Sequence, residues 1–214
     1  MSIYVTFSSS NYKLLTSEMF TDCEVVCEEK VWKLHRNILC SRTGYFQGAL
    51  CKSFTESEAR RVVLTEWTKE QVGMLIDFIY TGELCWDILR IQGTILHKAF
   101  QLWIMGDYFL IPELCSQTLD YLENHHVPDN ARAASLIGFK LAPTDWQNAG
   151  ELLYSYFPAD HKLKSVFLEI SLGKSHMRRK VINLPEFKVL ATKYPEFGRD
   201  CMVKLIEDNV TRLQ

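Results

Sequence analysis

Several features that would indicate a membrane, secreted or nucleic-acid-binding protein are missing from this 214-residue sequence. No apolar run approaches the ~20 residues of a membrane-spanning helix. The first ten residues, MSIYVTFSSS, lack the basic start and apolar stretch of a signal peptide. The net charge is only −2, and lysine and arginine do not cluster as a nucleic-acid groove requires. We therefore expect a cytoplasmic or nuclear protein that binds neither membrane nor nucleic acid.

Cysteine is present without the even number and regular spacing of a disulfide framework. The seven cysteines are irregularly placed and most have apolar neighbours, so we expect free thiols. Cys23, Cys27, His35 and Cys40 could be considered as a zinc site, but the first pair falls on a predicted strand. It lacks the tight knuckle of structural zinc ligands. Small core thiols explain these cysteines better, and we expect no metal and no cofactor.

Sequence motifs of catalysis are also missing. There is no phosphate-binding glycine loop, no nucleophile elbow and no pair of carboxylates in an apolar frame. Cys40 or Ser41 would need a nearby base and an orienting acid to act as a nucleophile. We expect no catalytic residue, no small-molecule substrate and no enzyme activity. The segment HMRRK, residues 176–180, could be a weak nuclear signal or a patch for an acidic partner, but a solvated loop explains it better.

The sequence does contain a short block of strands surrounded by helices. Apolar alternation predicts a hairpin of strands in DCEVVCEE and KVWKL, a third strand in RRVVLTE, and a short strand at residues 3–7. Helices are predicted at about 11–20, 35–41, 43–52, 68–80, 95–107 and 112–124. The helix at 68–80 has the clearest signals, because Thr68 and Gln71 form a capping box and Gly82 follows its end.

Beyond His126 the pattern predicts helices only. They are expected at about 129–140, 145–157, 161–172, 185–192 and 196–211, and Thr144 with Gln147 forms a second potential capping box. A small three-stranded sheet flanked by helices, followed by an all-α extension, is an α+β architecture.

Read in order, the motifs of residues 18–125 resemble a BTB/POZ domain. Asp22 begins a strand, and KLHRNILCSRTGYF matches the family's pattern of His-Arg, an apolar pair, Ser and an aromatic residue. The strings FTES, RRVVLTE, LIDFIYTGEL and GDYFLIPEL then follow in the family's order. The stretch CSRTGYFQGALCKSFTESEARRVVL is similar to BTB proteins of filamentous fungi. The resemblance implies an N-terminal segment at 1–17 that could be an exchanged strand, a BTB/POZ domain at 18–125 and a helical C-terminal extension at 126–214.

This resemblance implies a protein–protein interaction module, with two functions left open. BTB adaptors dock a cullin for ubiquitin ligase assembly through an apolar-x-Glu motif, which Phe54 and Glu56 match, with Phe109 on the same face. Phe54 would then be an exposed anchor, a composition typical of binding hot spots; otherwise it is a core residue and Glu56 a helix-end charge. The alternative function is a homo-oligomerising scaffold or transcriptional co-regulator without a ligase role. A channel-tetramerisation relative is disfavoured because no membrane segment exists.

The resemblance also implies self-association. Many BTB domains dimerise through the first helix, here about 11–20, and carry a charged pocket at the dimer interface, which Asp22 and Arg36 match. An ion pair inside one domain explains these two residues equally well. His35 is expected to bind a backbone carbonyl rather than to take part in chemistry.

Overall fold

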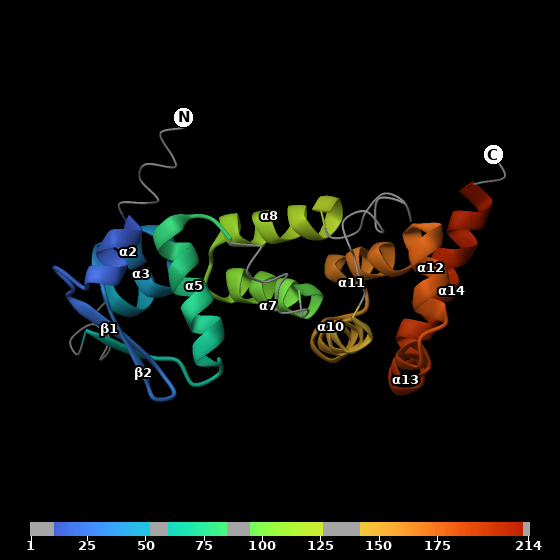
Figure 1. Ribbon diagram of the computed structural model, residues 1–214, viewed down its shortest axis with the longest axis horizontal. Helices are drawn as coiled ribbons and strands as arrows, with labels where there is room; N and C mark the ends of the chain where they lie inside the picture. Colours follow the sequence, from blue (N-terminus) through green and yellow to red (C-terminus); the bar gives the residue numbers. More distant parts are fainter. Residues whose placement is uncertain (1–10, 52–59, 85–94, 126–141, 212–214) are drawn as a thin grey trace. The chain divides into compact units, whose positions relative to one another are not determined.

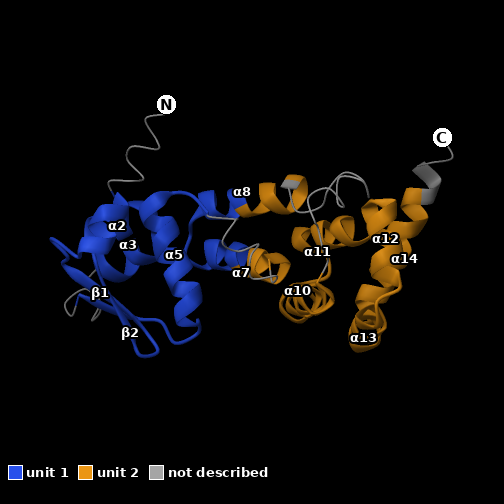
Figure 2. Cartoon of the chain, viewed as in Figure 1, with its two compact units in different colours: residues 1–85, 102–117 blue, residues 86–101, 118–214 orange. Residues whose placement is uncertain are grey.

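The computed structural model describes residues 11–51, 60–84, 95–125 and 142–211. The chain forms two compact units (Figure 2), of which unit 1 comprises residues 1–85 and 102–117 and unit 2 comprises residues 86–101 and 118–214. Helices α7 (Ile95–Tyr108) and α8 (Pro112–Asp120) therefore each contribute residues to both units. Within the described ranges, no helix is long and apolar enough to cross a membrane.

The sheet of unit 1 has three strands in the order β2-β1-β3 (Figure 1). β1 (Cys23–Cys27) pairs antiparallel with β2 (Lys30–Leu34), which places Val25 opposite Trp32. β3 (Arg61–Val63) lies parallel to β1 on its other side, with Val62 opposite Val25. Both valines are buried, as β-branched side chains on a core-facing strand should be. The predicted hairpin and third strand are confirmed.

Several helices of unit 1 bury apolar side chains in its core. They are α2 (Arg36–Arg42), α3 (Gly44–Cys51), α5 (Lys69–Thr81) and the parts of α7 and α8 that belong to the unit. Val72, Leu75, Ile76 and Ile79 recur at helical spacing along one face of α5, and all four are fully buried. Together with the sheet these helices confirm the α+β fold class.

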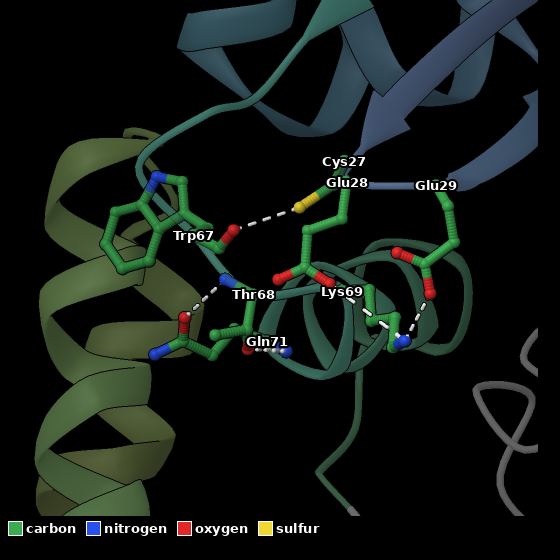
Figure 3. Close-up of polar contacts among 7 residues, drawn as sticks. All are labelled: Cys27, Glu28, Glu29, Trp67, Thr68, Lys69 and Gln71. Carbon is green, nitrogen blue, oxygen red and sulfur yellow. Dashed lines mark hydrogen bonds and ion pairs between the residues drawn. The ribbon is translucent and has the colours of Figure 1, made fainter.

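α5 begins and ends as its sequence predicts, and Figure 3 shows the contacts at its start. The backbone N–H of Gln71 donates to the Thr68 hydroxyl at 3.4 Å, and the Thr68 N–H donates to the Gln71 side-chain oxygen at 2.9 Å. This reciprocal pair satisfies two N–H groups that the first helical turn leaves free. At the other end Gly82 adopts a φ of +75° and its N–H donates to the Phe78 carbonyl.

The first residues of α5 also hold the β1–β2 turn (Figure 3). The Lys69 ammonium pairs with the carboxylates of Glu29 and Glu28, the latter at 4.0 Å. The Cys27 thiol at the end of β1 donates to the Trp67 carbonyl oxygen at 3.0 Å. The ion pairs are exposed and therefore contribute little stability, but they fix the turn over the helix start.

Unit 2 is built from helices around an aromatic core. The described helices that lie wholly within this unit are η1 (Tyr121–His125), α10 (Pro143–Tyr156), α11 (Lys162–Leu168), η2 (Glu169–Gly173), α12 (Ser175–Ile182), α13 (Pro185–Lys193) and α14 (Pro195–Thr211). Trp146 of α10 stacks on Phe167 at 5.4 Å between ring centroids and lies edge-on to Phe197 at 5.9 Å. Its indole N–H donates to the Ser171 hydroxyl at 2.9 Å, so the one polar group of the ring is satisfied.

The structure overturns the prediction of a loop at residues 176–180, which lie in helix α12. Met177 and Val181 are four residues apart on one face and both are fully buried. Arg178 caps the preceding π-helix by donating to the Leu172 carbonyl, and it pairs with Asp208 of α14. Charged residues surround these two apolar positions in HMRRK, so the sequence pattern indicates a loop. Tertiary packing of the short apolar face instead stabilises a helix here.

The prediction of a second capping box, at Thr144 and Gln147, is also wrong. α10 begins at Pro143, with Ala142 as the flanking residue, so Thr144 lies inside the helix and its side chain does not cap it. Proline is favoured at the first helical position because its fixed φ suits the helix and its missing N–H would be free there. The predicted strand at 3–7 and helix at 129–140 lie outside the described residues.

Candidate protein-interaction surface

Five aromatic rings cluster where α7 meets α8 in unit 1. Phe109 lies at the centre, with its ring centroid 4.9 Å from Tyr45, 5.8 Å from Phe46, 5.8 Å from Trp67 and 5.0 Å from Tyr108. Phe109 is fully buried. The expectation that Phe109 itself offers a ring to a partner is therefore wrong, because this side chain is the core of the cluster.

The residues on either side of Phe109 are the ones that reach the surface. Tyr108 is partly exposed and Leu110 is 61% exposed. Leu110 has a φ of +55°, a left-handed conformation that costs a non-glycine residue roughly 1–2 kcal/mol. We call Tyr108 and Leu110 the hinge surface.

Backbone contacts hold the hinge surface against the start of α3. The N–H of Tyr45 donates to the Phe109 carbonyl at 3.3 Å, and the N–H of Gly44 to the Leu110 carbonyl at 3.5 Å. A Cβ at Gly44 would lie 2.9 Å from the Leu110 Cδ1, so any other residue at this position would require the Leu110 side chain to shift. Glycine at this position thus allows the Leu110 side chain to lie over the helix start.

Phe54 and Glu56, the other two members of the expected docking set, lie outside the described residues. Their placement beside the hinge surface stays a prediction.

The Asp22 carboxylate and Arg36 meet through a different atom from the one expected. Asp22 Oδ1 accepts the backbone N–H of Arg36 at 2.7 Å, at the first residue of α2. The guanidinium of Arg36 instead interacts with the thiols of Cys51 and Cys40, chiefly that of Cys51, and this raises its pKa. The expected side-chain ion pair is thus replaced by a helix-capping contact, which suits a carboxylate at a helix N-terminus. A role for either residue at a dimer interface stays a prediction.

His35 bridges the core and the N-terminal segment. Its Nε2 lies 2.7 Å from the Met19 carbonyl oxygen, and its Nδ1 lies 2.8 Å from the Tyr80 hydroxyl. A carbonyl can only accept, so Nε2 carries the proton, and the Tyr80 O–H donates to Nδ1 while accepting the His35 backbone N–H at 2.9 Å. Burial raises the pKa of Tyr80 to about 12. The expectation that His35 binds a backbone carbonyl is confirmed.

A second group of apolar side chains is exposed near this bridge. Residues 11–17 are helical, and Tyr12, Met19 and Phe20 all face solvent, Phe20 with 85% of its surface exposed. Phe20 also has a positive φ, of +64°. An exposed aromatic residue held in a strained conformation is unusual in a residue that serves stability alone.

A family model, the BTB/POZ domain, matches residues 11–126, more than half of the chain. The chain belongs to the BTB/POZ family. Zebrafish Kelch-like protein 38 is 37% identical over 117 residues, and zebrafish Kelch-like protein 40a is 25% identical over 128 residues. These matches cover 55% and 60% of this chain but only 19% and 20% of the relatives, so the chain spans about a fifth of their length.

Among solved structures, the BTB domain of zebrafish PATZ1 is similar over 55% of this chain and 89% of that chain, with 13% identity and a TM-score of 0.43. BTB/POZ domains are generally protein–protein interaction modules. The hinge surface and the exposed group Tyr12, Met19 and Phe20 are consistent with that role.

Sequence reasoning placed Phe109 on an exposed face, whereas the structure buries Phe109 and exposes its neighbours Tyr108 and Leu110. In the string GDYFLIPEL, three consecutive apolar or aromatic residues, Tyr108, Phe109 and Leu110, are equally suited to burial. Only the turn that follows α7 decides which one points inward. The Pro112 at the start of α8 was a usable signal, because it shows that the chain must leave the helix shortly before it.

Proposed function

We propose that this BTB chain is an adaptor that docks a cullin for ubiquitin ligase assembly, using Phe54 and Glu56 together with the hinge surface. The resemblance to BTB adaptors supplies the apolar-x-Glu motif, and membership of the BTB/POZ family supports an interaction role. The match to zebrafish Kelch-like protein 38 covers 55% of this chain, which is consistent with a BTB module in this part of the chain.

The observation that carries the proposal is the exposure of Leu110. A large apolar side chain that is 61% exposed and held at positive φ has a conformational cost and no compensating burial in the free chain. Its backbone contacts to α3 keep it rigid, so a partner would not have to order it on binding. A rigid apolar anchor of this kind is typical of an interface centre.

The decisive experiment measures cullin binding and thermal melting on the same variants. Leu110→Ala and Glu56→Ala should each leave the melting temperature nearly unchanged. If these residues are anchors, each should weaken cullin binding by at least ~2 kcal/mol, about thirtyfold in affinity. Val189→Ala, an exposed residue of α13 in unit 2, is the matched control and should bind as the unmodified chain does.

Phe54→Ala distinguishes an anchor from a core residue. If Phe54 is an anchor, the substitution weakens cullin binding and leaves the melting temperature unchanged. If Phe54 is a core residue, the substitution lowers the folding stability by roughly 3–5 kcal/mol. A large drop in the melting temperature of Phe54→Ala, together with normal cullin binding by Glu56→Ala and Leu110→Ala, would reject the adaptor function.

The second candidate is a homo-oligomerising scaffold or transcriptional co-regulator. The exposed group Tyr12, Met19 and Phe20 favours it, because a strained aromatic residue just after the first helix is suited to a self-complementary contact. A chain that dimerises but captures no cullin from cells of its native organism would support this function instead. The resemblance to BTB proteins of filamentous fungi stays a prediction.

A further inference from the structure

Two thiols from neighbouring helices of unit 1 lie almost in bonding contact. Cys40 is in the last half of α2 and Cys51 is the last residue of α3, and their sulfur atoms are 2.9 Å apart. A disulfide bond is ~2.05 Å long, so the two sulfurs are within an ångström of that length. Both thiols are free in this structure. The helices therefore hold the pair close enough that bond formation requires only a small movement.

Three of the other described cysteines are less accessible. Cys23, Cys27 and Cys201 are buried, and burial raises the pKa of Cys23 and of Cys201 to about 12. Cys51, by contrast, is exposed and Cys40 is partly exposed. Cys115 is also partly exposed, but of the two partly exposed thiols it is Cys40 whose sulfur lies 2.9 Å from the exposed Cys51.

The electrostatic surroundings give the two thiols different roles. Arg36 lies one helical turn before Cys40, and its guanidinium interacts first with the Cys51 thiol and then with Cys40. A thiolate is the nucleophilic form of cysteine, and an adjacent cation stabilises it. Burial and its contact with Cys51 raise the pKa of Cys40 to about 12, so this thiol holds its proton tightly. Its thiol also donates to the Phe46 carbonyl at 3.5 Å. Cys51 is therefore the attacking thiol and Cys40 the resolving one.

We propose that Cys40 and Cys51 form a reversible disulfide when the protein meets hydrogen peroxide. The Cys51 thiolate attacks one peroxide oxygen, the O–O bond breaks, and the leaving hydroxide takes a proton to become water. The resulting Cys51 sulfenic acid is then attacked by the Cys40 sulfur. The S–O bond breaks, and the departing hydroxide leaves as water with the Cys40 proton. In total, two thiols and one peroxide give one disulfide and two waters. This proposal does not rest on the proposed cullin docking.

Peptide mapping tests the bond directly. The reduced full chain is treated with a stoichiometric amount of hydrogen peroxide, its free thiols are alkylated, and it is digested with trypsin. Trypsin cuts after Arg36, Arg42 and Lys52, so peptides 37–42 and 43–52 each carry one thiol of the pair. We expect these two peptides to be linked, the intact chain to be lighter by two hydrogen atoms, and dithiothreitol to reverse both changes.

Matched variants assign the roles. Cys51→Ser should leave Cys40 fully alkylatable after peroxide. Cys40→Ser should leave a Cys51 sulfenic acid that a dimedone probe traps. Cys115→Ser, a partly exposed cysteine of α8, is the control and should form the linked peptides as the unmodified chain does. Alkylation of both Cys40 and Cys51 after peroxide, or a bond to another cysteine such as Cys23, would overturn the proposal.

Arg36→Gln tests the activation of Cys51. The Asp22 carboxylate binds the backbone N–H of residue 36, so this capping contact survives the substitution. Disulfide formation should become several-fold slower, whereas Lys33→Gln, which removes an exposed cation that pairs with Glu18, should leave the rate unchanged. An equal rate in both variants would overturn the role of Arg36.

Discussion

At the scale of single residues, Phe109 and Leu110 are neighbours in the chain with opposite environments. Phe109 is the centre of an aromatic cluster, and Leu110 faces solvent. We expect Phe109→Ala to lower the free energy of unfolding by about 3–5 kcal/mol, because it leaves a cavity that the surrounding rings cannot fill. Leu110→Ala should change it by less than ~0.5 kcal/mol.

Urea unfolding of both variants, followed by tryptophan fluorescence, measures this difference. Equal losses of stability in the two variants would contradict the placement of Phe109 at the cluster centre.

Tyr80 provides a second residue-scale prediction. Its hydroxyl accepts the His35 N–H and donates to the His35 ring, and both residues are buried. In Tyr80→Phe the ring fits but a buried N–H and a buried ring nitrogen lose their partner. We expect a loss of about 1–3 kcal/mol in unfolding free energy. The control is Tyr156→Phe, since Tyr156 is largely exposed and its hydroxyl is not buried. A loss in Tyr80→Phe no larger than in the control would show that the network contributes nothing.

At the scale of elements, the chain offers a matched pair of threonines for testing helix capping. Thr68 caps α5 through a reciprocal contact with Gln71, whereas Thr144 lies inside α10 and caps nothing. Thr68→Ala should therefore destabilise the chain by about 1 kcal/mol. Thr144→Ala should have little effect or stabilise the helix slightly, because alanine is the better helix former. Thermal melts of the two variants check this order, and its reversal would reject the structural assignment of the caps.

A buried carboxylate ties α10 to the start of α7 within unit 2. Asp145 Oδ2 and Oδ1 accept the backbone N–H groups of Leu96 and His97 at 2.9 and 3.0 Å. Burial nevertheless raises the pKa of Asp145 above its ordinary value, while the two N–H donors oppose the rise. A folded-state pKa above the unfolded value means that Asp145 adds stability when it is protonated. This stability is complete below the unfolded value of about 3.9 and is lost as the pH rises through the folded-state pKa.

The corresponding measurement compares the unmodified chain with Asp145→Asn across pH. The unmodified chain should gain stability relative to the variant as the pH falls from neutral to about 4. Asp160→Asn, at an exposed position, should show no such trend. A relative loss of stability on acidification would mean that the two backbone donors outweigh burial.

At the scale of the whole molecule, we predict a homodimer formed through the first helix and the residues after it. Light scattering of the full chain at tens of micromolar should give twice the chain mass. Phe20→Asp should produce a monomer with an unchanged melt, because it removes an exposed aromatic contact and aspartate tolerates positive φ better than phenylalanine. Val189→Glu, on unit 2, should remain dimeric. A pure monomer in the unmodified chain would contradict the prediction.

The sequence by itself determined the fold class, the hairpin, the third strand and the limits of α5. Each of these depends on local signals: alternation at period two, an apolar stripe at helical spacing, and a reciprocal cap at Thr68 and Gln71. The BTB/POZ resemblance was likewise carried by short strings in a fixed order, which the family model confirms for residues 11–126. The binding of His35 to a backbone carbonyl was also anticipated correctly.

Only the tertiary structure decided which side chains are available for function. Whether Phe109 or Leu110 points outward depends on the left-handed turn at Leu110 and on the close approach of Gly44. That Arg36 faces two thiols rather than Asp22 depends on the packing of α2 against α3, as does the approach of Cys40 to Cys51 across eleven residues of chain. Local sequence patterns predict the conformation of each segment. These contacts instead arise from how separate segments pack together, and composition and spacing carry little information about that packing.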